Sequence, residues 1–136
     1  MQVREIMTTN VECISPSTTV EDAAKKMKSM DVGFLPICDK DRLIGTLTDR
    51  DIVVRGIAEN KDFKINVKNV MTSDVFFCFE DDDVEACAET MKEKEVKRML
   101  VLNRNRRLVG VVSIGDLAKA HETAAGGALK DISEAA

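Results

Sequence analysis

An internal duplication constrains the fold of this chain more than any other feature of its sequence. Val3–Thr8 is matched by Val67–Thr72, which lies 64 positions later. After a shift of one residue in a turn, Leu43–Gly45 is matched by Leu108–Gly110. Self-similarity at a fixed period is typical of proteins assembled from copies of one supersecondary unit. We therefore expect two copies of one such unit.

Each copy has the same predicted order of elements: a short helical turn, then strand, helix, strand, strand and helix. Apolar runs predict the strands, at Val11–Ile14, Phe34–Cys38, Leu43–Leu47, Val75–Phe79 and Met99–Leu102. The first helix of each copy has an apolar stripe at helical spacing and follows the pattern of a capping box, Thr18 with Glu21 and Asp82 with Glu85. The second helices are expected from about Asp49 to Glu59 and from Ile114 to about Thr123.

The size of each copy predicts how the two copies pack. A copy of about 60 residues is too small to bury three strands and two helices alone. We therefore expect an α/β (α+β) protein in which two β-α-β-β-α units pack about a pseudo-two-fold axis and share a core. The predicted divisions are 1–62, 63–124 and a C-terminal tail, 125–136. Clefts between such halves are common ligand sites.

A second repeated feature stands where the last strand of each copy runs into the last helix, at Gly45–Asp51 and Gly110–Asp116. Each has a hydroxyl at the junction and a carboxylate three residues later. A helix N-terminus attracts anions, and a carboxylate can accept hydrogen bonds from two neighbouring ribose hydroxyls. The same spacing is also a capping box, which only closes the helix end. Both interpretations stay open at this point.

Charge and apolar content argue against two classes of partner. The net charge is -4, and basic residues are interspersed with acidic ones. This distribution argues against a nucleic-acid-binding stripe or an anionic membrane surface. The basic turn Arg104–Arg107 is short and lacks aromatic residues. No apolar run approaches the ~20 residues that span a bilayer, and the N-terminus lacks the apolar core of a signal peptide.

The cysteines and the single histidine do not form a reactive or metal-binding pattern. Cys13, Cys38, Cys78 and Cys87 include no C-x-x-C pair, and His121 is the only histidine. Zinc sites and Cys-His nucleophiles need clusters that are absent here. We expect the four cysteines to be small buried hydrophobes in a reducing, cytoplasmic protein. Without a Ser-His-Asp set or a phosphate-binding Gly-rich loop, an enzyme is not expected.

With these motifs in place, the chain resembles a tandem pair of cystathionine β-synthase (CBS) domains, called a Bateman module, from about Val3 to about His121. The shared motif is glycine, two apolar residues, threonine or serine, two variable residues and aspartate. Asp31–Ile37 and Val96–Val101 stand where the second strand of the family begins. The resemblance implies a regulatory binding module that requires no cofactor. It also implies that AMP, ADP, ATP or S-adenosylmethionine binds in clefts between the halves.

The resemblance also implies two sets of ligand-binding residues. In one cleft Asp116 would hold the ribose, Ser113 and Lys97 would lie at the phosphate with Arg98 nearby, and the adenine end would be lined by Met7, Asn10, Glu12, Val32 and Gly33. The pseudo-symmetric cleft would use Asp51, Thr48, Arg50, Met71, Asp74, Phe76 and Val96.

The two predicted clefts differ in charge. Gly33 is the counterpart of Lys97, so the Asp51 cleft lacks that upstream cation, although Arg50 is a candidate substitute. Glu12 and Asp74 add negative charge, which repels a polyphosphate. We therefore predict tighter nucleotide binding in the Asp116 cleft.

Two functions remain in competition. The first is a sensor that binds an adenosine derivative and passes the signal to an unknown effector protein. The second is a ligand-free structural or dimerising module whose motifs are only helix caps. Apolar residues on the second helices, namely Ile52, Val53, Ile57 and Leu117, favour a homodimer through these helices.

Overall fold

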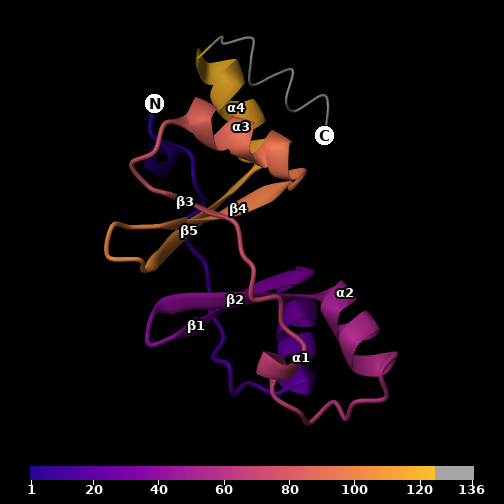
Figure 1. Cartoon of the computed structure of the whole chain (residues 1–136). Helices are drawn as coiled ribbons and strands as arrows, with labels where there is room; N and C mark the ends of the chain where they lie inside the picture. Colours follow the sequence, from indigo (N-terminus) through magenta and orange to yellow (C-terminus); the bar gives the residue numbers. More distant parts are fainter. Residues whose placement is uncertain (125–136) are drawn as a thin grey trace. The chain divides into compact units, whose positions relative to one another are not determined.

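The structure is a computed structural model that describes residues 1–124 (Figure 1). The predicted tail, 125–136, lies outside the described residues. The chain forms two compact units. The unit made of Glu12–Val75 is called here the Asp51 unit. The unit made of Met1–Val11 and the described residues from Phe76 to 124 is called the Asp116 unit.

The Asp51 unit pairs two strands beside two helices. It contains α1 (Val20–Met30), β1 (Phe34–Asp39), β2 (Arg42–Thr48), the short helix α2 (Asp49–Asp51), a π-helical segment (Ile52–Ile57) that continues α2, and a 3-10 turn (Val67–Asn69). β1 and β2 are antiparallel. Thr72, which follows the 3-10 turn, forms an antiparallel bridge to Thr46 in β2. The start of the second sequence copy is therefore part of this unit.

The Asp116 unit is built on a three-stranded sheet. It contains a 3-10 turn (Val3–Glu5), β3 (Phe77–Phe79), α3 (Val84–Lys94), β4 (Arg98–Leu102), β5 (Leu108–Ser113) and α4 (Ile114–Ala124). The sheet order is β3-β4-β5, with β3 parallel and β5 antiparallel to β4. The N-terminal segment is fixed to this unit, because the Val3 amide donates to the Asp82 carbonyl at 2.9 Å and Thr8 pairs with Val111.

Each unit has its own hydrophobic core among the described residues. In the Asp51 unit the cluster is Ile14, Val20, Ala23, Met27, Leu35, Ile37, Leu47, Val67 and Val70. In the Asp116 unit it is Val3, Cys78, Val84, Cys87, Ala88, Met91, Met99, Val101, Val112, Leu117 and Ala120. The expectation of one core shared by both halves stays a prediction. Each unit completes its core with a segment from before its first helix or after its last one.

Two prolines explain why the first predicted strand, Val11–Ile14, is reduced to one bridge. Ile14 pairs with Ile37 in parallel: its amide donates to the Pro36 carbonyl, and its carbonyl accepts from Cys38. To extend this ladder in either direction, Pro36 or Pro16 would have to donate an amide hydrogen that proline lacks. The corresponding strand of the Asp116 unit has no proline and keeps three pairs, at Phe77–Phe79.

The predicted caps of the first helices were wrong in detail. α1 is capped by Thr19, whose hydroxyl accepts from the Asp22 amide at 3.1 Å. Thr18 instead accepts the Val67 amide through its carbonyl, which holds it in the preceding turn. At α3 the N-cap is Asp83, without a side-chain hydrogen bond. Asp82 accepts from the Phe79 amide, so its carboxylate closes a turn rather than the helix.

The cysteines lie close together in pairs that their sequence spacing does not reveal. Cys38, Cys78 and Cys87 are buried as predicted, but Cys13 is exposed, which corrects that prediction. The sulfur atoms of Cys78 and Cys87 are 3.5 Å apart. The Cys38 thiol donates a hydrogen bond to Cys13, and this bond lowers the pKa of the Cys13 thiol. Within residues 1–124, no helix is long and apolar enough to cross a membrane.

Candidate functional site

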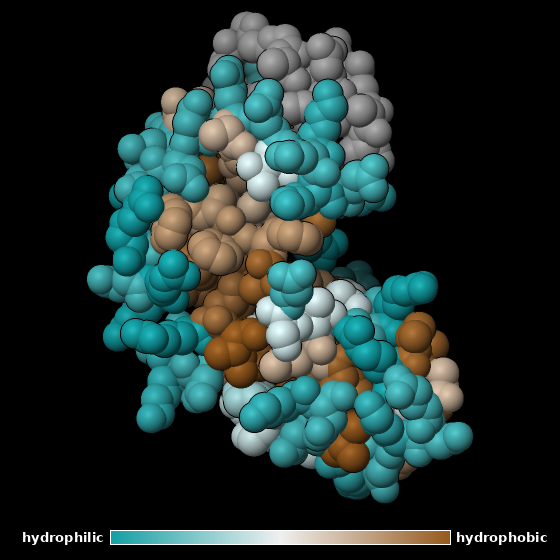
Figure 2. All heavy atoms as spheres, in the orientation of Figure 1, coloured by the Kyte–Doolittle hydropathy of each residue, from teal (hydrophilic) through white to brown (hydrophobic). Residues whose placement is uncertain are grey.

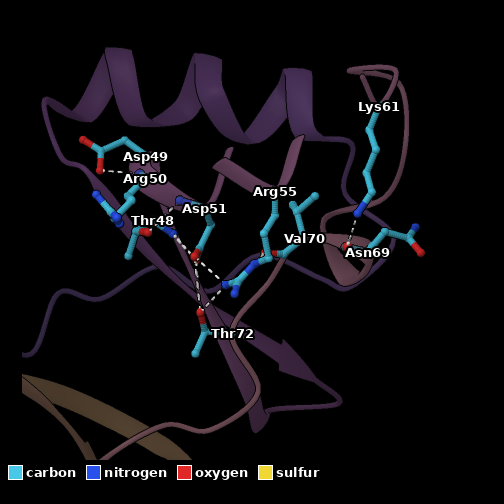
Figure 3. Close-up of polar contacts among 9 residues, drawn as sticks. All are labelled: Thr48, Asp49, Arg50, Asp51, Arg55, Lys61, Asn69, Val70 and Thr72. Carbon is cyan, nitrogen blue, oxygen red and sulfur yellow. Dashed lines mark hydrogen bonds and ion pairs between the residues drawn. The ribbon is translucent and has the colours of Figure 1, made fainter. Parts of the chain in front are cut away.

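Both strand-to-helix junctions form reciprocal capping boxes. At the start of α2 the Asp51 amide donates to the Thr48 hydroxyl at 3.1 Å, and the Thr48 amide donates to Asp51 Oδ2 at 3.0 Å (Figure 3). At the start of α4 the equivalent distances between Ser113 and Asp116 are 3.1 and 2.9 Å. The capping interpretation is confirmed at both junctions. Each carboxylate can still accept further hydrogen bonds from other neighbouring groups.

The motif glycines allow the Met-Thr segment of each unit to approach its last strand. A Cβ atom on Gly110 would lie 2.7 Å from the Met7 sulfur and 2.9 Å from the Thr8 carbonyl oxygen. A Cβ on Gly45 would lie 2.9 Å from the Met71 sulfur. No side chain fits at such distances. The structure therefore places Met7 beside the motif that ends at Asp116, and Met71 beside the motif that ends at Asp51.

The predicted cations of the Asp116 motif lie at the start of α4. The Ile114 amide donates to the Lys97 carbonyl at 3.0 Å. Arg98 is paired with Ser113 across β4 and β5. Both side chains are exposed, and Asp116 is half-buried. Lys97 makes no ion pair within the part of the chain that the structure describes. Ser113, Asp116 and the Lys97 backbone at the start of α4 are called here the Asp116 corner.

The Asp51 carboxylate has a cation partner that the sequence analysis missed. Arg55 Nη2 donates to Asp51 Oδ1 at 2.5 Å and to the Thr72 hydroxyl at 2.6 Å. Arg55 Nε donates to the Val70 carbonyl at 3.0 Å. Figure 3 shows these side chains converging between the helix and the segment that contains Thr72. The spacing of four residues between Asp51 and Arg55 is an ion-pair spacing on a helix, which was the available signal.

Arg50, the candidate substitute cation, is exposed and lies in α2 next to Asp51. Its amide donates to Asp49 Oδ1 at 2.8 Å. The Asp49 amide donates to the Gly33 carbonyl, and a Cβ on Gly33 would lie 2.7 Å from Asp49 Oδ2. The structure thus brings the backbone of Gly33 to the start of α2, in the same way as it brings Lys97 to the start of α4.

The remaining predicted residues are divided between the units. Met7, Asn10, Phe76 and Val96 belong to the Asp116 unit, whereas Glu12, Val32, Gly33, Met71 and Asp74 belong to the Asp51 unit. Their joint contribution to two ligand sites stays a prediction.

Two of these residues have partners inside their own units. Glu12 forms an ion pair with Lys26 at 3.1 Å. The Lys94 ammonium lies 5.6 Å from the ring centre of Phe76, which is partly exposed. Among the described residues, no group of three or more metal-ligating side chains is present.

The comparisons with known proteins agree with the duplication. The family model of the CBS domain matches residues 3–56 and again residues 67–122. The CBS domain-containing protein YhcV of Bacillus subtilis (strain 168) is 35% identical over 133 residues, which are 96% of this chain and 94% of YhcV.

Two solved structures are similar in fold and sequence. The crystal structure of Hypoxic Response Protein I with two coordinated zinc ions has a TM-score of 0.80 at 34% identity, and the match covers 88% of this chain and 98% of that one. The CBS domain pair of protein MJ0100, in complex with 5-methylthioadenosine and S-adenosyl-L-methionine, has a TM-score of 0.76 at 26% identity and covers 91% and 98%.

Proposed function

This chain belongs to the CBS-domain family, and on that premise we propose that it is a regulatory module rather than an enzyme. It binds an adenosine-containing small molecule and passes the signal to a partner protein. The ligands of the MJ0100 domain pair support this proposal, because methylthioadenosine and S-adenosylmethionine both contain adenosine.

The observation that supports the proposal best is the Asp116 corner. The capping box uses only Oδ2 of Asp116, and within residues 1–124 the other carboxylate oxygen has no donor. A carboxylate accepts several hydrogen bonds, so Oδ1 is available to neighbouring ribose hydroxyls. Ser113 and Lys97 lie at the N-terminus of an eleven-residue helix, where a phosphate is also stabilised when the ligand carries one.

The signal in this proposal is a shift between two arrangements of the chain. A ligand changes such an equilibrium only by the difference between its affinities for the two arrangements. By linkage, a partner that prefers the liganded arrangement raises the ligand's affinity by the same factor.

A thermal-shift panel of AMP, ADP, ATP, S-adenosylmethionine and methylthioadenosine tests the proposal. A ligand at 100 times its Kd adds about 2.7 kcal/mol of stability. Asp116→Asn is the matched control, because asparagine keeps an oxygen that can accept the Ser113 amide while losing the charge. We expect the shift to disappear in this variant and its unliganded melting temperature to change little. No shift with any of the five compounds at millimolar concentration would contradict the proposal.

A second candidate function is a dimerisation module, and the exposed face of one helix favours it. Val53, Val54 and Ile57 are 54, 45 and 68% exposed, and Figure 2 shows hydrophobic atoms at the surface of the helix that begins at α2. An apolar groove of about 390 Å³ lies between this helix, α1 and the loop that contains Phe63. Leu117 is fully buried, which corrects its predicted place on such a surface.

We propose that a second copy of this chain covers this face. Sedimentation velocity tests the homodimer. The wild-type chain is expected to sediment as a dimer and Ile57→Glu as a folded monomer. A wild-type monomer at all concentrations would contradict it.

A further inference from the structure

The two motif carboxylates have equivalent positions in the repeat but different neighbours. Asp51 is in contact with Arg55 and Thr72. The counterparts of these residues are Ala120 and Thr8. Ala120 is a buried core residue without a charge, and the Thr8 side chain makes no hydrogen bond within residues 1–124. The Asp116 carboxylate therefore keeps an open oxygen, whereas the Asp51 carboxylate does not.

The hydrogen-bonding capacity of Asp51 is used inside the chain. Oδ1 accepts from Arg55 Nη2, and Oδ2 accepts from the Thr48 amide. The Thr72 hydroxyl lies 3.3 Å from both oxygens. Asp51 is only 8% exposed. A ribose would have to displace Thr72 or Arg55 before its two hydroxyls could reach this carboxylate.

Arg55 is fixed in this position by three acceptors. Besides Asp51 it binds the Thr72 hydroxyl and the Val70 carbonyl. The planar guanidinium presents its donors in a rigid fork. A rotation away from Asp51 would therefore break contacts to the segment after the 3-10 turn as well.

The charge beside the first motif also disfavours an anionic ligand. Asp49 follows Thr48 directly and is exposed, with its Oδ1 on the Arg50 amide. Its counterpart in the second motif is Ile114. An acidic side chain at a helix start occupies the amide that a phosphate would bind and repels the phosphate charge.

We propose that Arg55 is an internal substitute for the ligand at the Asp51 motif, so that the chain binds a single adenosine derivative, at Asp116. Arg55 supplies the donors that a ribose diol would supply and neutralises the carboxylate. This inference deepens the proposed function and rests on it. It replaces the earlier prediction of two unequal clefts with one open and one closed motif.

Isothermal titration calorimetry with S-adenosylmethionine and AMP as probes tests this assignment. The wild-type chain is expected to bind one ligand, Asp116→Asn none, and Asp51→Asn one. Arg55→Gln, which frees the Asp51 carboxylate, is expected to bind a second S-adenosylmethionine, which carries no phosphate for Asp49 to repel, and Arg55→Gln combined with Asp51→Asn to bind one again. Lys61→Gln is the matched control, because Lys61 donates to the Asn69 carbonyl in the same segment without contacting Asp51 (Figure 3). It is expected to bind one ligand.

The possible failures are distinguishable. Two ligands on the wild-type chain, loss of binding in Asp51→Asn, or only one S-adenosylmethionine on a folded Arg55→Gln would each overturn the role of Arg55 and leave the proposed function intact. If Arg55→Gln does not fold, the wild-type and Asp51→Asn stoichiometries decide the question. A wild-type chain that binds neither probe contradicts the proposed function and removes this inference with it.

Discussion

At the scale of single residues, the role of a side chain depends less on its identity than on the groups that contact it. Asp51 and Asp116 end the same motif and cap their helices with the same geometry. Within residues 1–124, only Asp51 is joined to a cation, Arg55, which stands one helical turn further along the chain. The difference turns one carboxylate into a structural group and leaves the other with an unused acceptor.

Arg55→Ala tests the structural role of this ion pair. The change leaves a buried carboxylate without its cation, which is costly, although Arg55 itself is 43% exposed and solvent reduces the effect. We expect a loss of about 2 kcal/mol in the free energy of unfolding, measured by urea denaturation. Lys61→Ala should cost well under 1 kcal/mol, since its ammonium is exposed. Equal losses in the two variants would contradict a special role for Arg55.

Cys13 provides a second prediction at this scale. It is exposed, and the hydrogen bond from Cys38 lowers its pKa. Because the thiolate is the nucleophile, Cys13 should react first with iodoacetamide. The midpoint of its alkylation rate against pH should lie at a lower pH than for an ordinary thiol. Cys38→Ala removes the donor and should move that midpoint to higher pH.

Cys87 is the internal control for this measurement. The hydrogen bond between the Cys78 and Cys87 thiols lowers the pKa of Cys87, but the Cys87 side chain is buried. It should stay unmodified until the chain unfolds. Mass spectrometry of the alkylated peptides measures both results, and earlier modification of Cys87 would contradict the predicted order.

At the scale of elements, close backbone approach decides which segments meet. Gly110 has no room for a side chain because Met7 and the Thr8 carbonyl lie against it. The sequence analysis identified this glycine and the Met-Thr turn as parts of separate patterns. The two patterns are linked by this contact, because the Met-Thr turn crosses the strand at a position where only glycine fits.

Gly110→Ala and Gly115→Ala form a matched pair that tests this contact. In the first variant the Cβ would lie 2.9 Å from a backbone oxygen, so the N-terminal segment must move, and we expect a loss of about 2 kcal/mol. In the second the nearest atom is the Ser113 hydroxyl at 3.5 Å. Alanine in a helix should then stabilise the fold by about 0.5 kcal/mol. Thermal denaturation measures both, and equal effects would contradict the steric argument.

At the scale of the whole molecule, the duplication and its motifs predicted the family and the order of elements, and both are confirmed except for the strand Val11–Ile14, which is reduced to one bridge. The hydrophobic stripes of α1 and α3 and the apolar strands were readable because their period is local. Cys13, the caps of α1 and α3, and Arg55 were not predicted correctly. Some of these features depend on residues distant in sequence, such as Val67 for Thr18 and Thr72 for Arg55, and one sequence does not reveal such contacts. The spacing between Asp51 and Arg55 and the turn closed by Asp82 are local, and they were missed.

Two fragments of similar length test how the units are assembled. The fragment 12–75 contains every residue of the Asp51 core, whereas 1–62 lacks Val67 and Val70 from that cluster. We expect 12–75 to unfold cooperatively, as followed by circular dichroism, and 1–62 to be largely unfolded. A chain of this length is only marginally stable. The test is therefore the difference in cooperativity of unfolding between the two fragments. Equal behaviour would contradict the assignment of the 3-10 turn to this unit.

The N-terminal segment bonded to Asp82 and Val111 has a consequence for biosynthesis. Val3 and Thr8 leave the ribosome long before their partners, Asp82 and Val111, are translated. The Asp51 unit has all its parts once residue 75 has emerged, so we expect it to fold while translation continues. Val3 and Thr8 must meanwhile stay without these partners, and the Asp116 unit closes only after Val111 has emerged.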